Sequence, residues 1–403
     1  MSSALPVDGQ SCDGISLRVS SRQNMAMTLR DGARLRDRLE ARSGEMVQAL
    51  DVLVSTESTS GKPTLLERSA ECLRVLMGHV LGSQPRILSA AAGPHVHWTG
   101  GGSPKVLLIG HHDTVFPEGT VAARPFRVAH GRATGPGVFD MKAGIVQALF
   151  ALAELDTIDA VEILITADEE TGSATSRDLI VARARAAGSV LVLEPAADGG
   201  ALKIGRKGVG TFTVTISGRA SHAGLEPEKG VNALMELAAQ VPVIAALSRP
   251  ECGTTVTPTV AAAGTADNVV PARATLTVDI RIATDDERRR VEEAMRSLVA
   301  GVPGALMSVS GSVSRPPMPE SSAMGLLDVA RRVAPTVGLS DIAGVSVGGG
   351  SDGNFTAAAG VPTLDGLGAV GGGAHADHEW VDVASMGERS ALVAALVAAL
   401  VAA

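Results

Sequence analysis

Short apolar runs alternate with amphipathic segments in the first half of the chain. Residues 106–109, 161–166 and 190–193 are almost entirely apolar or β-branched, which favours buried strands. Residues 141–155 and 176–187 carry apolar side chains at helical spacing. Strands that alternate with helices predict an α/β fold whose sheet is at least partly parallel.

The pattern changes after Lys207, where strands of alternating polarity become frequent. The expected elements are a strand over 211–218, a helix over 231–247, strands over 254–262 and 274–283, a helix over 285–299 and a strand over 306–313. This β-α-β-β-α-β order is that of a ferredoxin-like unit. We therefore expect an α+β domain inserted into the α/β domain.

The two ends of the chain differ in character. Residues 1–30 are polar and mixed in charge, so we expect either a disordered extension or a true start at Met25 or Met27, rather than a signal peptide. A helix is expected over residues 31–53 and short strands over 85–100. Residues 391–403 are all Ala, Leu or Val, too few for a bilayer span of about 20 residues, which predicts a packed helix.

Length and composition limit the possible classes of protein. A chain of 403 residues predicts two domains, here a discontinuous catalytic domain (31–206 and 315–403) and an insertion (207–314). The net charge of −8 and the lack of Tyr argue against a nucleic-acid partner. The 3 isolated Cys suit a reducing cytoplasm, where we expect the protein, without a membrane partner.

Histidines follow the strand over residues 106–109. His111 and Asp113 are two residues apart on an extended segment, so their side chains share a face. A metal-binding imidazole usually donates its other N–H to a carboxylate, and this pair supplies both groups. His112 is the competing ligand, and two ordinary surface histidines would also fit the pattern.

Carboxylates follow the next two strands. Glu169 and Glu170 come after residues 161–166, and Glu194 comes after 190–193. Consecutive carboxylates repel each other unless they are well solvated or near a cation. A solvated acidic loop is therefore the alternative to a metal site. Two adjacent Glu residues also permit one to bind metal and the other to accept a proton.

Two further candidates lie in Gly-rich segments. Asp140 ends the turn GPGVFD at the start of a helix, where it would either bridge two metal ions or cap the helix. His375 lies near the end of the chain, with His378 as its alternative. Strand ends in an α/β sheet converge on one crevice, and His, Asp and Glu without Cys are typical of a hydrolytic zinc centre.

Taken together, these segments resemble a known family. HHDTV, GPGVFDMKAG, TADEETGS, LEPA, GRASHAGLEPEKGVNAL and AHADHEWV are similar to motifs of the aminoacylase and glutamate-carboxypeptidase family, and within it to the bacterial enzymes that cleave folates. The resemblance covers the chain from about residue 35 onwards. It implies a zinc-peptidase-like mixed sheet with helices on both faces, and an inserted ferredoxin-like domain that forms a homodimer.

The resemblance also implies a role for each site residue. The expected cofactors are two Zn²⁺ ions, replaceable by Co²⁺ or Mn²⁺. The implied metal ligands are His111 and Glu194 for one ion, Glu170 and His375 for the other, and Asp140 for both. Glu169 would be the general base and Asp113 would orient His111. His222 would stabilise the oxyanion, in the partner subunit's site.

Substrate binding is implied for a further set of residues. Asn268 and Arg281 match positions that contact the substrate carboxylate in the family. Gly350 lies in a Gly-rich segment whose N–H groups suit an anion. Arg206 and Arg315 are additional cations, although each Arg would equally fit an exposed surface.

We therefore expect a zinc-dependent hydrolase that cleaves an amide bond beside a free carboxylate. The expected reaction releases a C-terminal amino acid, glutamate by resemblance, from an N-acyl or folate-like substrate or short peptide. One alternative is a deacylase of the acetylornithine or succinyl-diaminopimelate type. Another is an inactive homologue that acts as a binding protein.

Overall fold

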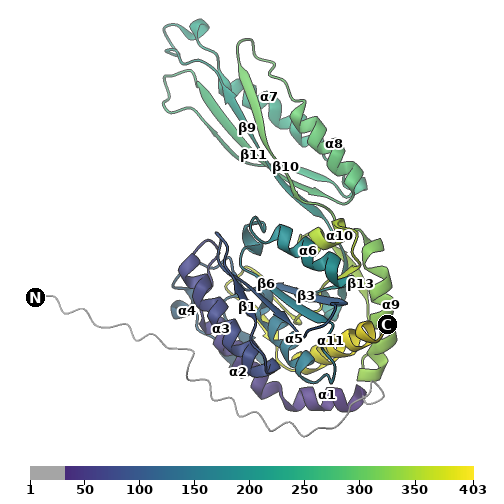
Figure 1. The fold of residues 1–403 in the computed structure, drawn as a ribbon. Coiled ribbons are helices and arrows are strands. Elements are labelled where there is room, and N and C mark those ends of the chain that lie inside the picture. The colour runs from purple at the N-terminus through teal and green to yellow at the C-terminus, as the bar shows by residue number, and fades with distance from the viewer. Residues whose placement is uncertain (1–31) are drawn as a thin grey trace, which may run out of the picture. The chain divides into compact units, whose positions relative to one another are not determined.

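The computed structural model describes residues 32–403, so the expectation for residues 1–30 lies outside the described part of the chain (Figure 1). The chain divides into two compact units. The first contains residues up to Leu202, Gly325–Gly344 and Pro362–Ala403. The second contains Lys203–Met324 and Val345–Val361.

A six-stranded mixed sheet forms the centre of the first unit, in the order β1-β2-β6-β3-β7-β14. Its strands are β1 (Arg86–Leu88), β2 (His95–Thr99), β3 (Val106–His111), β6 (Val161–Thr166), β7 (Val190–Val192) and β14 (Thr363–Leu364). β3 pairs in parallel with β6 and β7, and β7 pairs in parallel with β14. β1 and β2 extend the sheet in antiparallel pairing. This sheet confirms the predicted fold class.

Helices cover both faces of the sheet. The helices in this part of the chain are α1 (Gly32–Ala41), α2 (Ser43–Ser55), α3 (Pro63–Leu81), α4 (Thr120–Ala123), α5 (Ala143–Ala153), α6 (Arg177–Ala187), α9 (Met324–Val333) and α11 (Ser385–Ala402). α5 and α11 pack on each other and on β3, whereas α6 lies on the opposite face (Figure 1). A small antiparallel sheet contains β4 (Arg127–Ala129), β5 (Arg132–Thr134), β15 (Gly371–Gly372) and β16 (Trp380–Asp382).

The sequence pattern accounts for the central strands and, with two corrections, for the helices. Every residue of β3 and β6 is buried, as expected for strands that are covered on both faces. The helix predicted over 31–53 is two helices, because Arg42 leaves the helical conformation (φ −92°, ψ 7°). The helix predicted from residue 141 begins at Ala143, because Val138–Lys142 form an irregular turn with non-helical dihedral angles.

The C-terminal helix α11 is part of the core. By length and composition it would cross a membrane, but 67% of its apolar stretch is buried inside the fold. Its Arg389 is buried, and the guanidinium donates to the carbonyl oxygens of Gly200, Gly366 and Gly368. The prediction of a packed helix is therefore confirmed, and the helix begins at Ser385, before the all-apolar stretch.

The second unit contains the predicted ferredoxin-like domain. Its elements are β9 (Gly208–Ser217), α7 (Ala233–Ala245), β10 (Thr255–Ala263), β11 (Arg273–Ile282), α8 (Asp285–Arg296) and β12 (Leu306–Arg315). The sheet is antiparallel, in the order β10-β11-β9-β12. Alternate residues of β9 and β11 face a core that includes Leu237 of α7 and Val291 of α8. Both helices therefore pack on one face of the sheet.

The second unit also includes Val345–Val361, which comes later in the chain than the predicted insertion. This segment contains α10 (Gly353–Ala358) and most of β13 (Gly344–Val347), which pairs with β8 (Leu202–Arg206). Arg206 donates to the carbonyl oxygens of Gly349 and Gly350 at 3.2 Å, and Arg315 forms an ion pair with Asp352 at 3.0 Å. These buried cations attach the segment to the strands of the second unit.

Candidate metal centre

The fold of the first unit brings five predicted metal ligands together. His111 is the last residue of β3, and Glu170 lies in a short 3-10 turn (Glu169–Thr171) after β6. Glu194 follows β7 by two residues, and Asp140 lies in the turn before α5. His375 lies in the loop between β15 and β16. Parallel strands that end at one edge of the sheet therefore position three of the five side chains.

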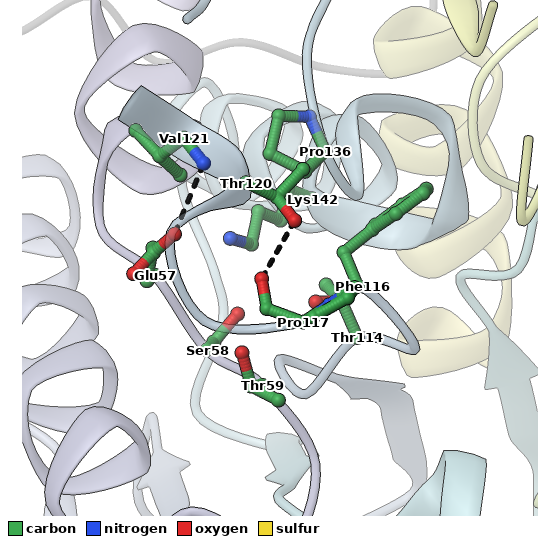
Figure 2. A pocket seen from close by; sticks show the side chains of 10 residues that line it. All are labelled: Glu57, Ser58, Thr59, Thr114, Phe116, Pro117, Thr120, Val121, Pro136 and Lys142. Atoms are coloured by element: carbon green, nitrogen blue, oxygen red, sulfur yellow. Dashed lines mark hydrogen bonds between the residues drawn. The ribbon is translucent and has the colours of Figure 1, made fainter. Parts of the chain in front are cut away.

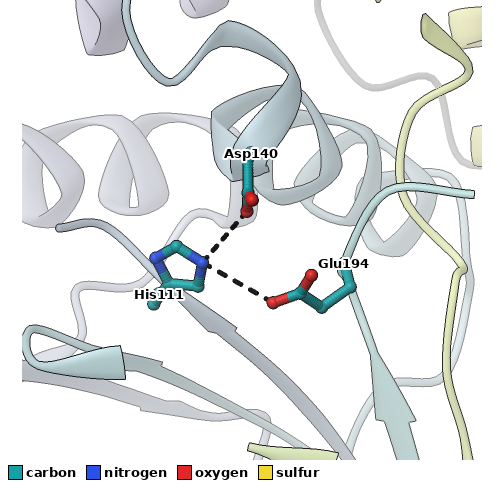
Figure 3. Close-up of side chains that lie close together, drawn as sticks. All are labelled: His111, Asp140 and Glu194. Carbon is teal, nitrogen blue, oxygen red and sulfur yellow. Dashed lines mark hydrogen bonds and ion pairs between the residues drawn. The ribbon is translucent and has the colours of Figure 1, made fainter. Parts of the chain in front are cut away.

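His111, Asp140 and Glu194 form one group of ligand atoms (Figure 3). Nε2 of His111 lies 3.2 Å from Oδ1 of Asp140 and 3.6 Å from Oε1 of Glu194. The imidazole is buried, with 2% of its side chain exposed. All three side chains point toward one another from three different elements (Figure 3).

Asp140, Glu170 and His375 form a second group. Nε2 of His375 lies 3.3 Å from Oδ2 of Asp140 and 3.2 Å from Oε1 of Glu170. Asp140 thus directs one carboxylate oxygen to each histidine. His375 is half exposed and adopts a positive φ of 63°, so this group is the more accessible of the two.

Excess negative charge controls the electrostatics of the cluster. Hydrogen bonds to Asp140 and Glu170 raise the pKa of His375 to about 10. Burial opposes protonation of His111, but the neighbouring carboxylates outweigh it and raise its pKa well above the usual value. Burial also acts to raise the pKa of Asp140, yet the two histidines hold that pKa low. Positive charge is therefore strongly favoured between these residues.

The donor set fits two divalent metal ions. Each group offers one imidazole nitrogen and two carboxylates, which are ligand types that Zn²⁺ accepts, and three protein ligands are the usual number in a catalytic zinc site. The shared carboxylate is the arrangement that two-metal hydrolases use to hold ions about 3.5–4 Å apart. The neighbouring carboxylates that raise the pKa values of His111 and His375 would also attract metal ions. Protons on the two rings offset the negative charge that bound metal ions would otherwise offset.

Asp113 connects both halves of the cluster. Its Oδ1 lies 3.5 Å from Nδ1 of His111, whereas its main-chain oxygen is closer to that nitrogen, at 3.0 Å. Its carboxylate also accepts the backbone N–H groups of Glu169 and Glu170, both at 3.2 Å, and the hydroxyl of Ser60 at 2.8 Å. Asp113 therefore fixes the ring of one ligand and the turn that carries another.

The alternative histidines lie outside both ligand groups. His112 is buried, its Nε2 bonds to the Pro94 carbonyl at 3.0 Å, and its Nδ1 bonds to the Ser69 hydroxyl at 2.9 Å. Burial lowers the pKa of His112 to about 4, so this ring is neutral. His378 is exposed and belongs to neither group among the described residues. Glu169 is likewise outside both groups, next to the ligand Glu170.

Within the second unit, the remaining candidates separate into two sets. His222 and Asn268 lie together. The Ala223 N–H donates to the Asn268 carbonyl at 2.9 Å, and His222 pairs with Val269 in an isolated antiparallel β-bridge. This set lies beyond the end of the sheet where Ser217 pairs with Arg273.

Arg281, Arg206, Arg315 and Gly350 lie at the other end of that sheet. Arg281 is opposite Val209 on β9, which is also opposite Arg315 on β12. Nε and Nη2 of Arg281 donate to the two oxygens of Asp279, both at 3.0 Å. Arg206 and Arg315 are buried and have the structural partners described above. A Cβ at Gly350 would lie 2.9 Å from the Val209 side chain.

The two sets lie near opposite ends of strand β11, whose residues Arg273 and Arg281 are eight positions apart. Arg273 and Arg281 are both on β11, and a strand rises about 3.3 Å per residue, which gives about 26 Å between the two ends. His222 lies beyond the Arg273 end. His222 and Arg281 of one chain therefore cannot contact the same small substrate.

A small cavity is lined in part by Pro136 and Lys142, which precede and follow Asp140 in the chain (Figure 2). Glu57, Ser58, Thr114 and Lys142 are among its lining residues. Lys142 is buried and donates to the Thr56 carbonyl at 3.1 Å, and burial lowers its pKa to about 8. The cavity measures about 10 Å³, enough for roughly one water molecule, so it is no substrate site.

Three residues at the site were not predicted from the sequence. Ser60 donates to the Asp113 carboxylate, and Lys142 joins the Asp140 turn to the Thr56 carbonyl. Glu379 accepts three backbone N–H groups from the Asp140 turn. Lys142 and Glu379 lie in the segments GPGVFDMKAG and AHADHEWV, where no pattern distinguishes them from their neighbours.

A mixed α/β sheet that gathers His, Asp and Glu side chains at its strand ends defines a metal-dependent hydrolase. Residues 107–399 match the model of peptidase family M20/M25/M40. The chain is 35% identical over 314 residues to carboxypeptidase G2 of Pseudomonas sp. (strain RS-16), covering 74% of each protein. It is 26% identical to a succinyl-diaminopimelate desuccinylase of Wolinella succinogenes, over 70% of this chain and 79% of that one. The chain therefore belongs to peptidase family M20/M25/M40.

Solved structures share the fold. The aminopeptidase PepT of Bacillus cereus superposes with a TM-score of 0.70 at 22% identity, covering 89% of this chain and 99% of that one. A dinuclear metal-binding peptidase of the M20 family from Bacillus subtilis gives a TM-score of 0.64 at 16% identity, covering 89% and 98%. The resemblance to a metallopeptidase family of carboxypeptidases and deacylases is thus confirmed, whereas the roles of individual residues stay predictions.

Proposed function

We propose that this protein is a di-zinc carboxypeptidase that releases an amino acid with a free α-carboxylate, with glutamate as the first candidate, from an N-acyl or peptidyl substrate. The observation that carries the proposal is the position of Asp140, whose two oxygens face two separate ligand groups. The similarity to carboxypeptidase G2 supports the reaction, and the dinuclear peptidase of B. subtilis supports two metal ions.

Residues of this chain divide the chemistry between them. Bound metal ions would polarise the scissile carbonyl and acidify the attacking water. Glu169 would take the proton from the attacking water and return it to the leaving amine, the role that the family resemblance implies for the residue next to the ligand Glu170. Asp113 holds the Glu169 backbone N–H, which fixes the base relative to His111.

His222 serves as a neutral hydrogen-bond donor to the oxyanion. Its Nδ1 accepts the backbone N–H groups of Gly224 and Leu225, both at 3.1 Å. A ring nitrogen that accepts carries no proton, so the proton of the neutral ring is on Nε2. Nε2–H is then the donor that an oxyanion needs.

A homodimer brings the two separated sets of substrate residues to one site. About 26 Å divides Arg281 from the set of His222 and Asn268 within one chain, so we propose that the two sets act on one substrate from different subunits. The surface of the inserted domain supports this assembly. Its exposed apolar side chains include Met235 and Val243 on α7 and Val260 on the edge strand β10.

The proposal is tested by assay of metal-free and metal-loaded protein. We expect the chelated protein to be inactive, and Zn²⁺, Co²⁺ or Mn²⁺ to restore hydrolysis of an N-acyl glutamate at two ions per chain. N-succinyl-diaminopimelate and N-acetylornithine are measured in parallel, since desuccinylases and a deacetylase are also relatives. If either of these two substrates were hydrolysed faster than the N-acyl glutamate, the protein would be a deacylase rather than a carboxypeptidase.

Arg281→Lys should lower kcat/KM for an N-acyl glutamate by about tenfold to a hundredfold. The guanidinium pairs with Asp279 through Nε and Nη2 and can still offer Nη1 to a substrate carboxylate, whereas an ammonium cannot present donors in this fixed planar geometry. A hydrogen bond to a charged group contributes roughly 1.5–3 kcal/mol. Arg273→Lys, on the exposed opposite end of β11, is the matched control and should leave the rate unchanged. Equal wild-type rates on the free acid and its α-amide would exclude carboxylate recognition.

A further inference from the structure

Glu379 is a fully buried carboxylate behind the metal cluster, with 0% of its surface exposed. Its Oε2 accepts the backbone N–H of Gly137 at 2.8 Å. Its Oε1 accepts the backbone N–H groups of Phe139 at 2.9 Å and Asp140 at 2.8 Å. Both oxygens are therefore bonded to one short turn.

The turn precedes α5 and departs from regular helical geometry. Buried backbone N–H groups need acceptors, and those of Gly137, Phe139 and Asp140 are paired with Glu379. Gly137 has a φ of 73° and Asp140 has non-helical angles (φ −112°, ψ 93°). A Cβ at Gly137 would lie 2.5 Å from the Thr114 side chain, so the turn is closely packed. Glu379 thus supplies acceptors that the backbone does not.

The chain around Glu379 also carries His375. The Ala376 N–H donates to the Gly373 carbonyl at 2.9 Å, and the Glu379 N–H donates to the Ala376 carbonyl at 3.1 Å. Nη1 of Arg124 donates to the Ala376 carbonyl at 3.0 Å. These bonds make the segment from His375 to Glu379 a compact loop, which continues directly into β16.

We propose that Glu379 is the positioning residue of the second ligand group. Its carboxylate joins the turn of Asp140 to the loop of His375, and so fixes the two side chains that must hold one metal ion together with Glu170. The inference rests on the proposed metal centre. Residues that orient metal ligands typically change metal affinity or activity by about 10–100-fold when they are substituted.

The test compares wild type, Glu379→Gln and Glu236→Gln. Glu236 is a matched control in the other unit, because it is also fully buried and accepts the backbone N–H groups of Gly301 and Val302. Zinc affinity is measured by competition with a chromogenic chelator. The visible spectrum of the Co²⁺-substituted proteins reports the geometry of the ligands directly.

We expect Glu379→Gln to bind its weaker zinc ion about 10–100-fold less tightly and to show an altered Co²⁺ spectrum. Glu236→Gln should lose thermal stability while its affinity and spectrum stay those of wild type. Wild-type affinity and spectrum in Glu379→Gln would overturn the positioning role. A wild-type protein that binds no metal would instead overturn the proposed metal centre.

Glu379→Asp is the second variant if Glu379→Gln does not fold. It keeps the negative charge but is shorter by one methylene group, so it cannot reach all three N–H groups in the same geometry. We expect weaker zinc binding and an altered Co²⁺ spectrum in this variant as well. Wild-type values would show that charge alone is sufficient, and the proposal of a geometric role would fail.

Discussion

Glu169→Gln should lower kcat about a thousandfold while the protein keeps both metal ions. A positioned general base contributes roughly 10²–10⁴-fold to the rate, and the amide cannot accept a proton from the attacking water. Metal content should not change, because Glu169 belongs to neither group of ligand atoms. Steady-state kinetics and elemental analysis of the same preparation measure both quantities.

Glu170→Gln provides the control on the neighbouring residue. Glu170 lies 3.2 Å from Nε2 of His375, so its substitution should reduce the metal content to about one ion per chain. If Glu169→Gln lost a metal ion while Glu170→Gln remained fully loaded, the two roles would have to be exchanged.

His222→Ala should lower kcat by about 10²–10³-fold, the usual effect of removing one donor to an oxyanion. Zinc content should stay the same, because His222 is in the second unit and outside both ligand groups. His79→Ala, which removes an exposed histidine from α3, is the matched control and should retain wild-type activity.

Mixed dimers test whether His222 acts in the partner's site. A dimer of one His222→Ala chain and one Glu169→Gln chain has one site with both functional groups, provided that the histidine comes from the other subunit. Mixing the two inactive variants should therefore recover part of the activity. A monomer with full activity in solution would contradict the donated histidine.

The ligand positions could be predicted because each depends on local sequence. Apolar runs identify β3, β6 and β7, and His111, Glu170 and Glu194 follow these runs directly. The convergence of parallel strand ends then predicts that the side chains meet. The same reasoning gave the β-α-β-β-α-β order of the inserted domain, since its strands alternate in polarity and its helices do not.

Features that depend on distant segments could not be predicted in this way. Asp113 accepts N–H groups from a turn more than fifty residues away, and Glu379 from a turn about 240 residues away. Val345–Val361 belongs to the second unit because Arg206 and Arg315 bind Gly349 and Asp352. In the sequence, these two arginines cannot be distinguished from surface arginines. Helix α3 is absent from the elements predicted above, although the helical spacing of Leu66, Leu73 and Leu76 is sufficient to predict it.

The burial of α11 bears on how the catalytic unit forms during synthesis. α11 packs on α1 and α5, and Arg389 donates to three carbonyl groups from earlier segments. The ribosome synthesises this helix after every other described element of the unit. Until then, the apolar surfaces of α1, α5 and β3 that α11 covers remain exposed. The strands and helices of the ferredoxin-like domain are all synthesised by Arg315, and Val345–Val361 follows later. Both parts therefore leave the ribosome before α11 covers the apolar face of the first unit. The apolar face of the first unit is therefore closed only after α11 has been synthesised.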